Sequence, residues 1–365
     1  MNDKIADPTP NQAAAENVFK NFLARIEKTE RVVCLHDSDA DGVTAGVVWQ
    51  RGMEQLGFTN IKRLSTGRER NAFSDEAKNL IKPENPQFLF VMDLGSQPQA
   101  IVDVPVCFID HHRPGGVLEE DTLVSAYTWN PVPNTSLIVY DLFSSLTDIS
   151  QYDWIAAIGT ISDLGEKAPF ELLETTRQKY TAKWLKETVS LVNAARRASN
   201  YEPETAAQAL LNFSDPKELV NSNTTEVERL RQAKAEVKTE LDEARKAAPV
   251  FAGNVALVRL NSPCQIHPLI AQSWRTRLPK YIVIAANTGY MPGKVNFAAR
   301  TSAAGVSVLD FLRGFKLDVS AGGSYGQGHD QASGGVLPVK TWNELLAKIG
   351  FPESVFAKIE AKGAN

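Results

Sequence analysis

The stretch "RVVCLHDSDADG", residues 31–42, decides the fold of the N-terminal half of the chain. It begins with a short, apolar, β-branched run, which is typical of a buried strand. Three carboxylates follow at every second position, and a glycine then allows a turn into an apolar helix predicted over 42–56. In an extended segment this spacing places Asp37, Asp39 and Asp41 on one face. A cation among them would relieve their repulsion, so the stretch indicates a metal site.

Two other interpretations of the acidic run are a calcium loop and a solvated surface turn. A calcium loop of the EF-hand type needs a glutamate at its twelfth position to close the metal shell, and Val48 stands there. The apolar run before the acids also favours a strand over the entering helix of an EF-hand. A solvated turn is the ordinary explanation of one short acidic run, so the rest of the chain has to decide.

The first half of the chain alternates strands with helices. Apolar runs too short for helices recur at 88–93 and 104–110, and each ends in an aspartate. Amphipathic stretches follow at 134–146 and 152–164. The pattern predicts an α/β fold with a mostly parallel sheet covered on both faces. The polar strand ends would then meet at the carboxyl edge, where such sheets hold ligands.

The second half predicts a helical region and then a smaller α/β domain. From about residue 170 the pattern is helical, and its last part is charged with i,i+4 pairs, which favours an exposed connecting helix. Beyond it we predict strands and helices in alternation, with strands at 254–261, 281–288, 294–302 and 335–340 and helices at 267–278 and 306–314. The predicted division is a catalytic domain over 1–225, a connecting helix over 226–249 and a second domain over 250–365.

Composition places the chain among ordinary globular proteins. It has 365 residues, of which 43% are hydrophobic and 22% charged. Its apolar runs are too short for a bilayer span, and a secretory signal is not indicated. Three cysteines without a C-x-x-C pair fit a reducing cytoplasm, so we expect a cytoplasmic protein without a membrane partner. The net charge of −4 argues that any contact with nucleic acid is local.

Histidines and further aspartates stand at the ends of the predicted strands and helices. The stretch "FIDHHRPGG" supplies Asp110, His111 and His112, while Asp93 ends a strand and Asp163 lies in "GTISDLGEK". Carboxylate-rich shells with imidazole suit Mn²⁺ or Mg²⁺ better than Zn²⁺. We therefore expect two Mn²⁺ ions, with Mg²⁺ as the alternative, spaced about 3.5–4 Å apart as in phosphoryl-transfer sites.

Six motifs together resemble a known family. "DSDADG", "VMDLG", "DHH" and "SDLG" occur in the order found in the DHH phosphoesterase superfamily, and the first is most similar to its RecJ branch. "VNFAARTSAAGVSVLDFL" (295–312) and "GGSYGQGHDQASGG" (322–335) are similar to the arginine strand and the glycine–histidine motif of the DHH-associated substrate-binding domain. The resemblance therefore extends over both predicted domains.

The resemblance implies a role for each matching residue. The implied metal shell consists of Asp37, Asp39, Asp41, Asp93, His111 and Asp163, with Asp93 as the bridge. His112 would lie beside the scissile phosphate. We expect Asp110 to orient a histidine, with direct ligation of metal as the alternative. The implied substrate-binding residues are Arg300, Gly326, Gly328, His329, Gly334 and Gly335. Many relatives carry a histidine at or just before the first aspartate, so His36 and Asp37 both stay candidates for that ligand. Solvated loops explain four arginines near the motifs at least as well as contact with substrate phosphate does: Arg68, Arg70, Arg196 and Arg197.

The function implied by the resemblance is a metal-dependent phosphodiesterase or exonuclease. It would hydrolyse single-stranded or short oligonucleotides with water activated by two metal ions. A phosphodiesterase or phosphatase acting on cyclic dinucleotides or 3′-phosphoadenosine 5′-phosphate is the alternative enzyme. The alternative outside the enzymes is an inactive DHH scaffold that binds nucleic acid. A homodimer is one assembly that this interpretation allows.

Overall fold

The computed structural model describes residues 9–319 and 322–358, and the chain forms two compact units. The first unit runs to Arg196 and resumes over Tyr201–Gln232. The second takes Arg197–Asn200 and continues from Ala233. Among the described residues, no helix combines the length and the apolar character that a bilayer span requires.

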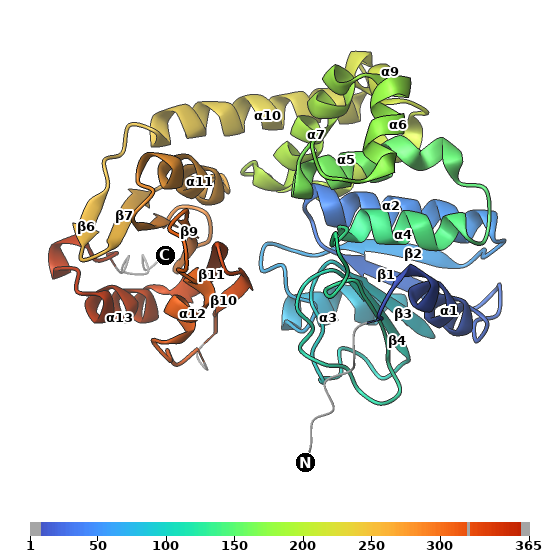
Figure 1. Cartoon of the computed structure of the whole chain (residues 1–365), viewed down its shortest axis with the longest axis horizontal. Helices are drawn as coiled ribbons and strands as arrows, with labels where there is room; N and C mark the ends of the chain where they lie inside the picture. The colour runs from blue at the N-terminus through green and yellow to red at the C-terminus, as the bar shows by residue number, and fades with distance from the viewer. Residues whose placement is uncertain (1–8, 320–321, 359–365) are drawn as a thin grey trace, which may run out of the picture. The chain divides into compact units, whose positions relative to one another are not determined.

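The first unit is built on a five-stranded sheet (Figure 1). Its strands are β1 (Val32–His36), β2 (Ile61–Ser65), β3 (Phe88–Met92), β4 (Val106–Asp110) and β5 (Thr122–Ser125). Their order is β2-β1-β3-β4-β5, and every neighbouring pair is parallel. This confirms the predicted α/β fold, and the three strands predicted for this half of the chain correspond to β1, β3 and β4. The edge strands β2 and β5 were not predicted, because β2 mixes polar with apolar residues and β5 has only four residues.

Helices cover both faces of this sheet. Alternate side chains of β1 point to opposite faces, and they belong to two different hydrophobic cores. Cys34 lies in a core with side chains from several helices, among them α1 (Gln12–Leu23), α2 (Ala40–Gln55), α4 (Thr135–Ser144) and α5 (Asp153–Leu164). Val33 and Leu35 lie in a second core with Ala77 and Ile81 of α3 (Asp75–Ile81). The predicted helices over 134–146 and 152–164 correspond to α4 and α5.

The remaining helices of the middle region are α6 (Glu171–Tyr180), α7 (Ala182–Arg197), α8 (Pro203–Asn212), α9 (Pro216–Asn221) and α10 (Thr225–Ala244). The expected charged helix is α10, and the boundary between the two units falls within it. It is less exposed than predicted: Val227 and Leu230 are buried in the first unit and Val237 in the second. Single 3-10 turns occur at Lys82–Glu84, Ser150–Tyr152 and Glu353–Val355.

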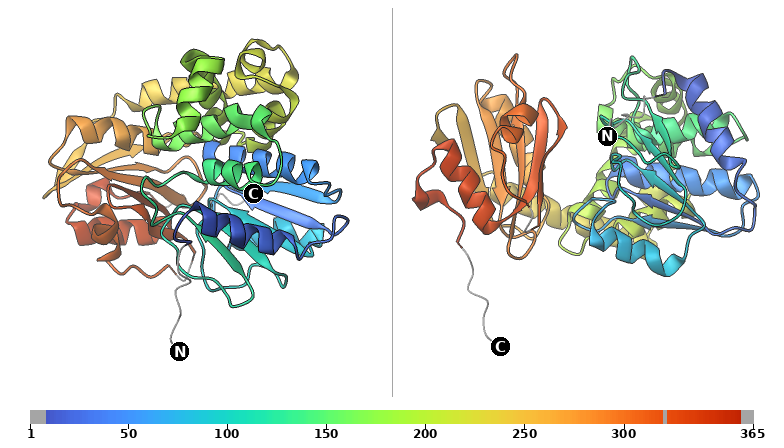
Figure 2. Two further views of the ribbon diagram at one scale, coloured as in Figure 1. Left: turned by 45° about the vertical axis from the view of Figure 1, so that its right-hand side comes forward. Right: turned by 90° about the horizontal axis from the view of Figure 1, so that it is seen from below.

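The second unit contains a six-stranded mixed sheet (Figure 2). Its strands are β6 (Val250–Ala252), β7 (Val255–Leu260), β8 (Ile282–Asn287), β9 (Lys294–Thr301), β10 (Ser324–His329) and β11 (Ala332–Pro338), in the order β10-β11-β9-β8-β7-β6. Only the pair β7–β8 is parallel among these strands. The helices are α11 (His267–Arg277), α12 (Val308–Arg313) and α13 (Val339–Ile349). The strand predicted over 335–340 corresponds to β11, which lies a few residues earlier in the chain because α13 begins at Val339.

Candidate metal centre

The acidic run lies between β1 and α2, at the carboxyl edge of the parallel sheet. The strand ends at His36 and the helix begins at Ala40, so Asp39 is the N-cap. Its Oδ1 accepts hydrogen bonds from the backbone N–H groups of Asp41 (3.1 Å) and Gly42 (3.2 Å). The prediction of an extended segment reaching Asp41 was therefore wrong, since these capping bonds start the helix two residues earlier than expected. Asp41 projects from the first helical turn.

Asp41 is held by the N-terminus of α4. Its Oδ1 accepts hydrogen bonds from the Ser136 N–H (2.7 Å) and the Asn134 side-chain amide (2.6 Å), and its Oδ2 accepts from the Thr135 N–H (3.0 Å). Burial, followed by the charges of neighbouring carboxylates, nevertheless raises the pKa of Asp41 well above its usual value. These three partners of Asp41 were not predicted to belong to the site. An Asn-Thr-Ser run opening a helix was the signal available.

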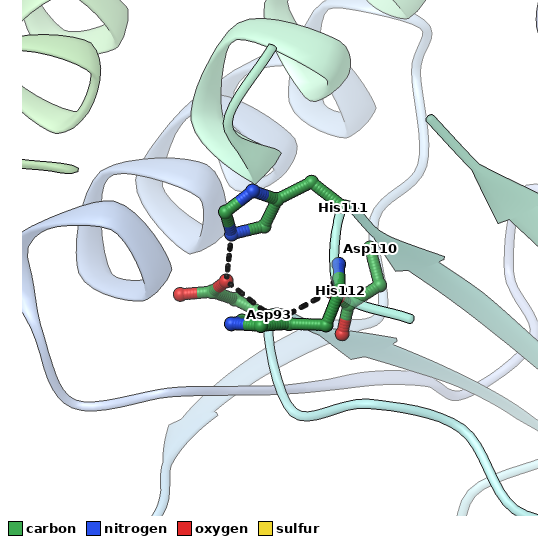
Figure 3. A group of neighbouring side chains, drawn as sticks. All are labelled: Asp93, Asp110, His111 and His112. Atoms are coloured by element: carbon green, nitrogen blue, oxygen red, sulfur yellow. Dashed lines mark hydrogen bonds and ion pairs between the residues drawn. The ribbon is translucent and has the colours of Figure 1, made fainter. Parts of the chain in front are cut away.

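Asp93 follows β3 and lies between the two histidines (Figure 3). Its Oδ1 is 3.4 Å from His111 Nε2 and 3.8 Å from His112 Nδ1, and it accepts a hydrogen bond from Thr135 Oγ1 (3.1 Å). Its backbone has φ 62°, in the left-handed region that non-glycine residues rarely adopt. Burial, then the charge of Asp39, raises the pKa of Asp93 well above normal. A nearby cation would favour the ionised carboxylates and would therefore lower the pKa values of both Asp41 and Asp93.

Asp110 ends β4 and fixes the orientation of His112. Its Oδ1 accepts a hydrogen bond from the His112 backbone N–H and lies 2.7 Å from Nδ1 of the same residue, while its Oδ2 accepts from the Gly95 N–H. Burial alone would raise the pKa of Asp110, but His112 outweighs it and holds the pKa below the usual range. Burial has the opposite effect on His112, whose protonation it opposes, yet Asp110 raises the pKa of His112 to about 9.

His111 points toward two further carboxylates. Its Nε2 lies 3.8 Å from Asp41 Oδ2 and 3.8 Å from Asp163 Oδ2. Asp163 belongs to the last turn of α5, and its side chain is 35% exposed, whereas Asp41 is buried. The potential ligand atoms of Asp41, His111 and Asp163 all lie within 4.8 Å of one another. The three side chains therefore form a compact group of potential ligands that is exposed to solvent at Asp163.

Asp37 and Asp39 are bridged by Arg70, which lies in the loop between β2 and α3. Arg70 Nε is 2.8 Å from Asp37 Oδ1, and its Nη2 pairs with Asp37 Oδ2 and lies 2.9 Å from Asp39 Oδ2. Arg196 Nη2 lies 3.9 Å from the same oxygen of Asp39. Burial would raise the pKa of Asp39, but Arg70 and Arg196 hold it below the usual range. The solvated-loop interpretation was wrong for both arginines. No local sequence signal links Arg70 to acids more than thirty residues earlier.

Comparison with known proteins identifies the fold. No protein-family model matches the chain. The single-stranded-DNA-specific exonuclease RecJ of Salmonella typhimurium is 27% identical over 121 residues, which are 31% of this chain and 21% of that protein. A solved exonuclease RecJ bound to manganese has a TM-score of 0.61 at 19% identity and covers 93% of this chain and 96% of its own. The chain has the fold of the RecJ exonucleases.

A RecJ from Thermus thermophilus, solved in complex with Mn²⁺, is similar over 94% of this chain with a TM-score of 0.65 and 18% identity. This chain spans 54% of that structure, and its match covers only about a fifth of the Salmonella protein. Both solved structures hold manganese, and this chain has carboxylate and imidazole clusters that could bind such an ion.

His36 is turned away from these clusters. It is fully buried, with Nδ1 2.6 Å from the carbonyl oxygen of Asp37 and Nε2 3.0 Å from Arg63 Nη1. Arg63 in turn forms an ion pair with Glu204 (2.8 Å). Burial, then the charge of Arg63, lowers the pKa of His36 to about 3. Of the two candidates for the first ligand, the fold brings only Asp37 close to Asp39 and Asp93.

The substrate-binding residues implied for the second domain lie on β9, β10 and β11. Arg300 Nη1 donates to the carbonyl oxygens of Ala299 and Ser333, both at 3.0 Å, and burial, then Arg275, lowers the pKa of Arg300 to about 10. The glycines of the motif lie on the last two strands, Gly326 and Gly328 on β10 and Gly334 and Gly335 on β11. A Cβ on Gly335 would lie 2.3 Å from the carbonyl oxygen of Ser324, so close strand packing already requires that glycine. The side chain of His329 lies outside the described part of the structure.

Proposed function

We propose that the chain is a metal-dependent phosphodiesterase that hydrolyses single-stranded or short oligonucleotides. The observation that carries this proposal is the position of Asp93. Its carboxylate belongs to a ligand group with Asp37 and Asp39, and also to a group with Asp110, His111 and His112. A carboxylate shared by adjacent groups is what a bridged pair of divalent ions requires.

The donor set fits two ions of Mn²⁺, with Mg²⁺ as the alternative. Asp41, His111 and Asp163 would hold one ion, Asp37 and Asp39 would hold the other, and Asp93 would contact both. Carboxylate oxygens mixed with imidazole match the preference of these metals, and the Thermus RecJ has been solved with each of them. When bound, such a pair polarises a phosphoryl oxygen and makes water nucleophilic near neutral pH.

The protein side chains then have separate tasks. Asn134 and the N–H groups of Thr135 and Ser136 fix Asp41, so this ligand does not have to be reorganised when an ion binds. Asp110 keeps His112 oriented and favours its protonated form. Because the His112 side chain is 34% exposed, its ring can donate a hydrogen bond to a phosphate oxygen and stabilise developing negative charge.

The substrate class rests on the family. The Salmonella relative is named for single-stranded DNA, and the motifs of this chain resemble those of enzymes that act on oligonucleotides. An inactive scaffold would not need the complete set of aspartates and histidines, of which Asp41 and Asp93 are buried at considerable electrostatic cost. Hydrolysis is therefore the better explanation of the site.

A substrate panel with controlled metal content tests the proposal. The full chain, stripped with chelator, is assayed with and without Mn²⁺ on short DNA and RNA, long single-stranded DNA, a cyclic dinucleotide and 3′-phosphoadenosine 5′-phosphate. We expect Mn²⁺-dependent release of nucleotides from the single-stranded oligonucleotides. Asp93→Asn controls for contaminating nuclease, and Asp103→Asn removes an exposed carboxylate at the opposite end of β4 as the matched control. Undiminished hydrolysis in excess chelator, or activity on the two small nucleotides alone, would contradict the proposal.

A further inference from the structure

Arg70 is the cation that Asp37 and Asp39 hold in the structure. Its guanidinium contacts both oxygens of Asp37 and also Oδ2 of Asp39. These two carboxylates form, with Asp93, one of the groups that could hold a metal ion. The group of Asp41, His111 and Asp163 is arranged differently. Its Asp41 carboxylate already accepts hydrogen bonds from backbone N–H groups and faces His111.

A metal ion and the Arg70 guanidinium compete for the same carboxylates. A carboxylate oxygen that coordinates a divalent ion has less electron density to offer an N–H donor, and the two cations would repel each other at contact distance. A divalent ion between Asp37 and Asp39 therefore requires the guanidinium to move away. Binding at this position is weakened by the free energy needed to break the existing ion pair.

Arg70 is placed so that its side chain can leave. It lies in the loop between β2 and α3, its side chain is 31% exposed, and its backbone has φ 49°, a conformation that costs free energy for a non-glycine residue. Arg196, the other cation near Asp39, lies on α7 with a side chain only 9% exposed. The start of the loop is fixed, since the Tyr201 hydroxyl lies 2.8 Å from the carbonyl oxygen of Thr66. Movement can thus be confined to the Arg70 side chain and its immediate backbone.

We propose that Arg70 is a displaceable counter-ion that makes the metal centre fill in order. The Asp41–His111–Asp163 group takes the first ion, and the Asp37–Asp39–Asp93 group takes the second only after Arg70 has left. This inference rests on the metal centre of the proposed function and adds a sequence of binding steps to it. At low metal concentration the protein then holds one ion, with Arg70 neutralising the other position.

Titration with Mn²⁺ tests the order directly. Full-length protein stripped of metal is titrated by calorimetry, and the metal content at each plateau is measured by elemental analysis after dialysis. The wild-type chain should show two separate binding steps. In Arg70→Gln the second step should become about tenfold tighter, the size expected for losing a partly exposed charge-assisted pair, while the first step stays within about twofold. Arg68→Gln is the matched control, because it removes a charge from the same loop, where its guanidinium lies 5.1 Å from the Tyr201 ring centroid.

Arg70→Lys is a second variant in case Arg70→Gln misfolds, which circular dichroism would reveal. Lysine keeps the charge but lacks the planar guanidinium, so the affinity of the second Mn²⁺ step should rise by a smaller factor than in Arg70→Gln. Two equal steps in the wild-type chain would overturn the proposal, as would a second step that is unchanged or weaker in both Arg70 variants. Failure of the wild-type chain to bind any Mn²⁺ would instead overturn the metal centre itself, and this inference with it.

Discussion

Asp110→Asn should change the protonation of His112 more than any other single substitution in the centre. The asparagine keeps the shape of the side chain but removes the charge 2.7 Å from Nδ1. In the metal-free protein the pKa of His112 should fall from about 9 to its ordinary value of 6.5 or below, because burial then acts without the opposing carboxylate.

The size of the accompanying stability change follows from the shift. The difference of 9 − 6.5 corresponds to about 3 kcal/mol at most, and the partial exposure of His112 reduces it to about 1–2 kcal/mol. A pKa raised on folding stabilises the native state fully below pH 6.5, and this stabilisation is lost as the pH rises through about 9. Urea unfolding at pH 6 should therefore show a larger difference between the wild-type and Asp110→Asn proteins than unfolding at pH 10.

Proton NMR of the histidine rings in metal-stripped protein measures the pKa itself. The His112 resonance is assigned by comparison with His112→Gln, and Asp103→Asn serves as a control for loss of a carboxylate elsewhere. A His112 pKa that stays within about half a unit of the wild-type value in Asp110→Asn would refute the account of this pair.

Other parts of the centre give further predictions. Asn134→Ala should weaken the first Mn²⁺ binding step by about tenfold, measured by calorimetry, because Asp41 loses the amide that lies 2.6 Å from its Oδ1. Unchanged affinity would show that the Asn134 amide does not support Asp41. Gly46→Ala should lower the free energy of unfolding by about 1–3 kcal/mol in urea titrations, since the new Cβ would lie 2.3 Å from His36 Cδ2 in a buried position. Full stability of that variant would mean that the His36 ring can shift without cost.

The fold of the first unit could be predicted where residues bury both faces of a strand. β1, β3 and β4 are fully buried, so each is a continuous apolar run that periodicity identifies. β2 lies at the edge of the sheet and contains Lys62 and Arg63, so its sequence has no such signal. The helix start at Ala40 was also missed, because an aspartate can continue an extended segment or cap a helix, and only the following N–H groups decide between them.

The candidate site was predictable as far as each member ends a strand or follows one. Asp93 follows the buried strand β3, Asp110 ends the buried strand β4, and the parallel sheet brings these strand ends together at one edge. Arg70 and Asn134 could not be placed in this way. Their contacts with Asp37 and Asp41 depend on the path of a loop and on the docking of α4, both of which are set by packing between segments far apart in the sequence.

Electron paramagnetic resonance of the Mn²⁺-loaded protein tests the central claim, that Asp93 joins two metal positions, most directly. Two ions bridged by one carboxylate are magnetically coupled, whereas separated ions give the resolved hyperfine lines of isolated Mn²⁺. With two equivalents of Mn²⁺, the wild-type chain should give a coupled spectrum, and Asp93→Asn should give isolated ions together with a loss of about 10³-fold in hydrolysis. Isolated Mn²⁺ in the wild-type chain, or full coupling and activity in Asp93→Asn, would contradict the account.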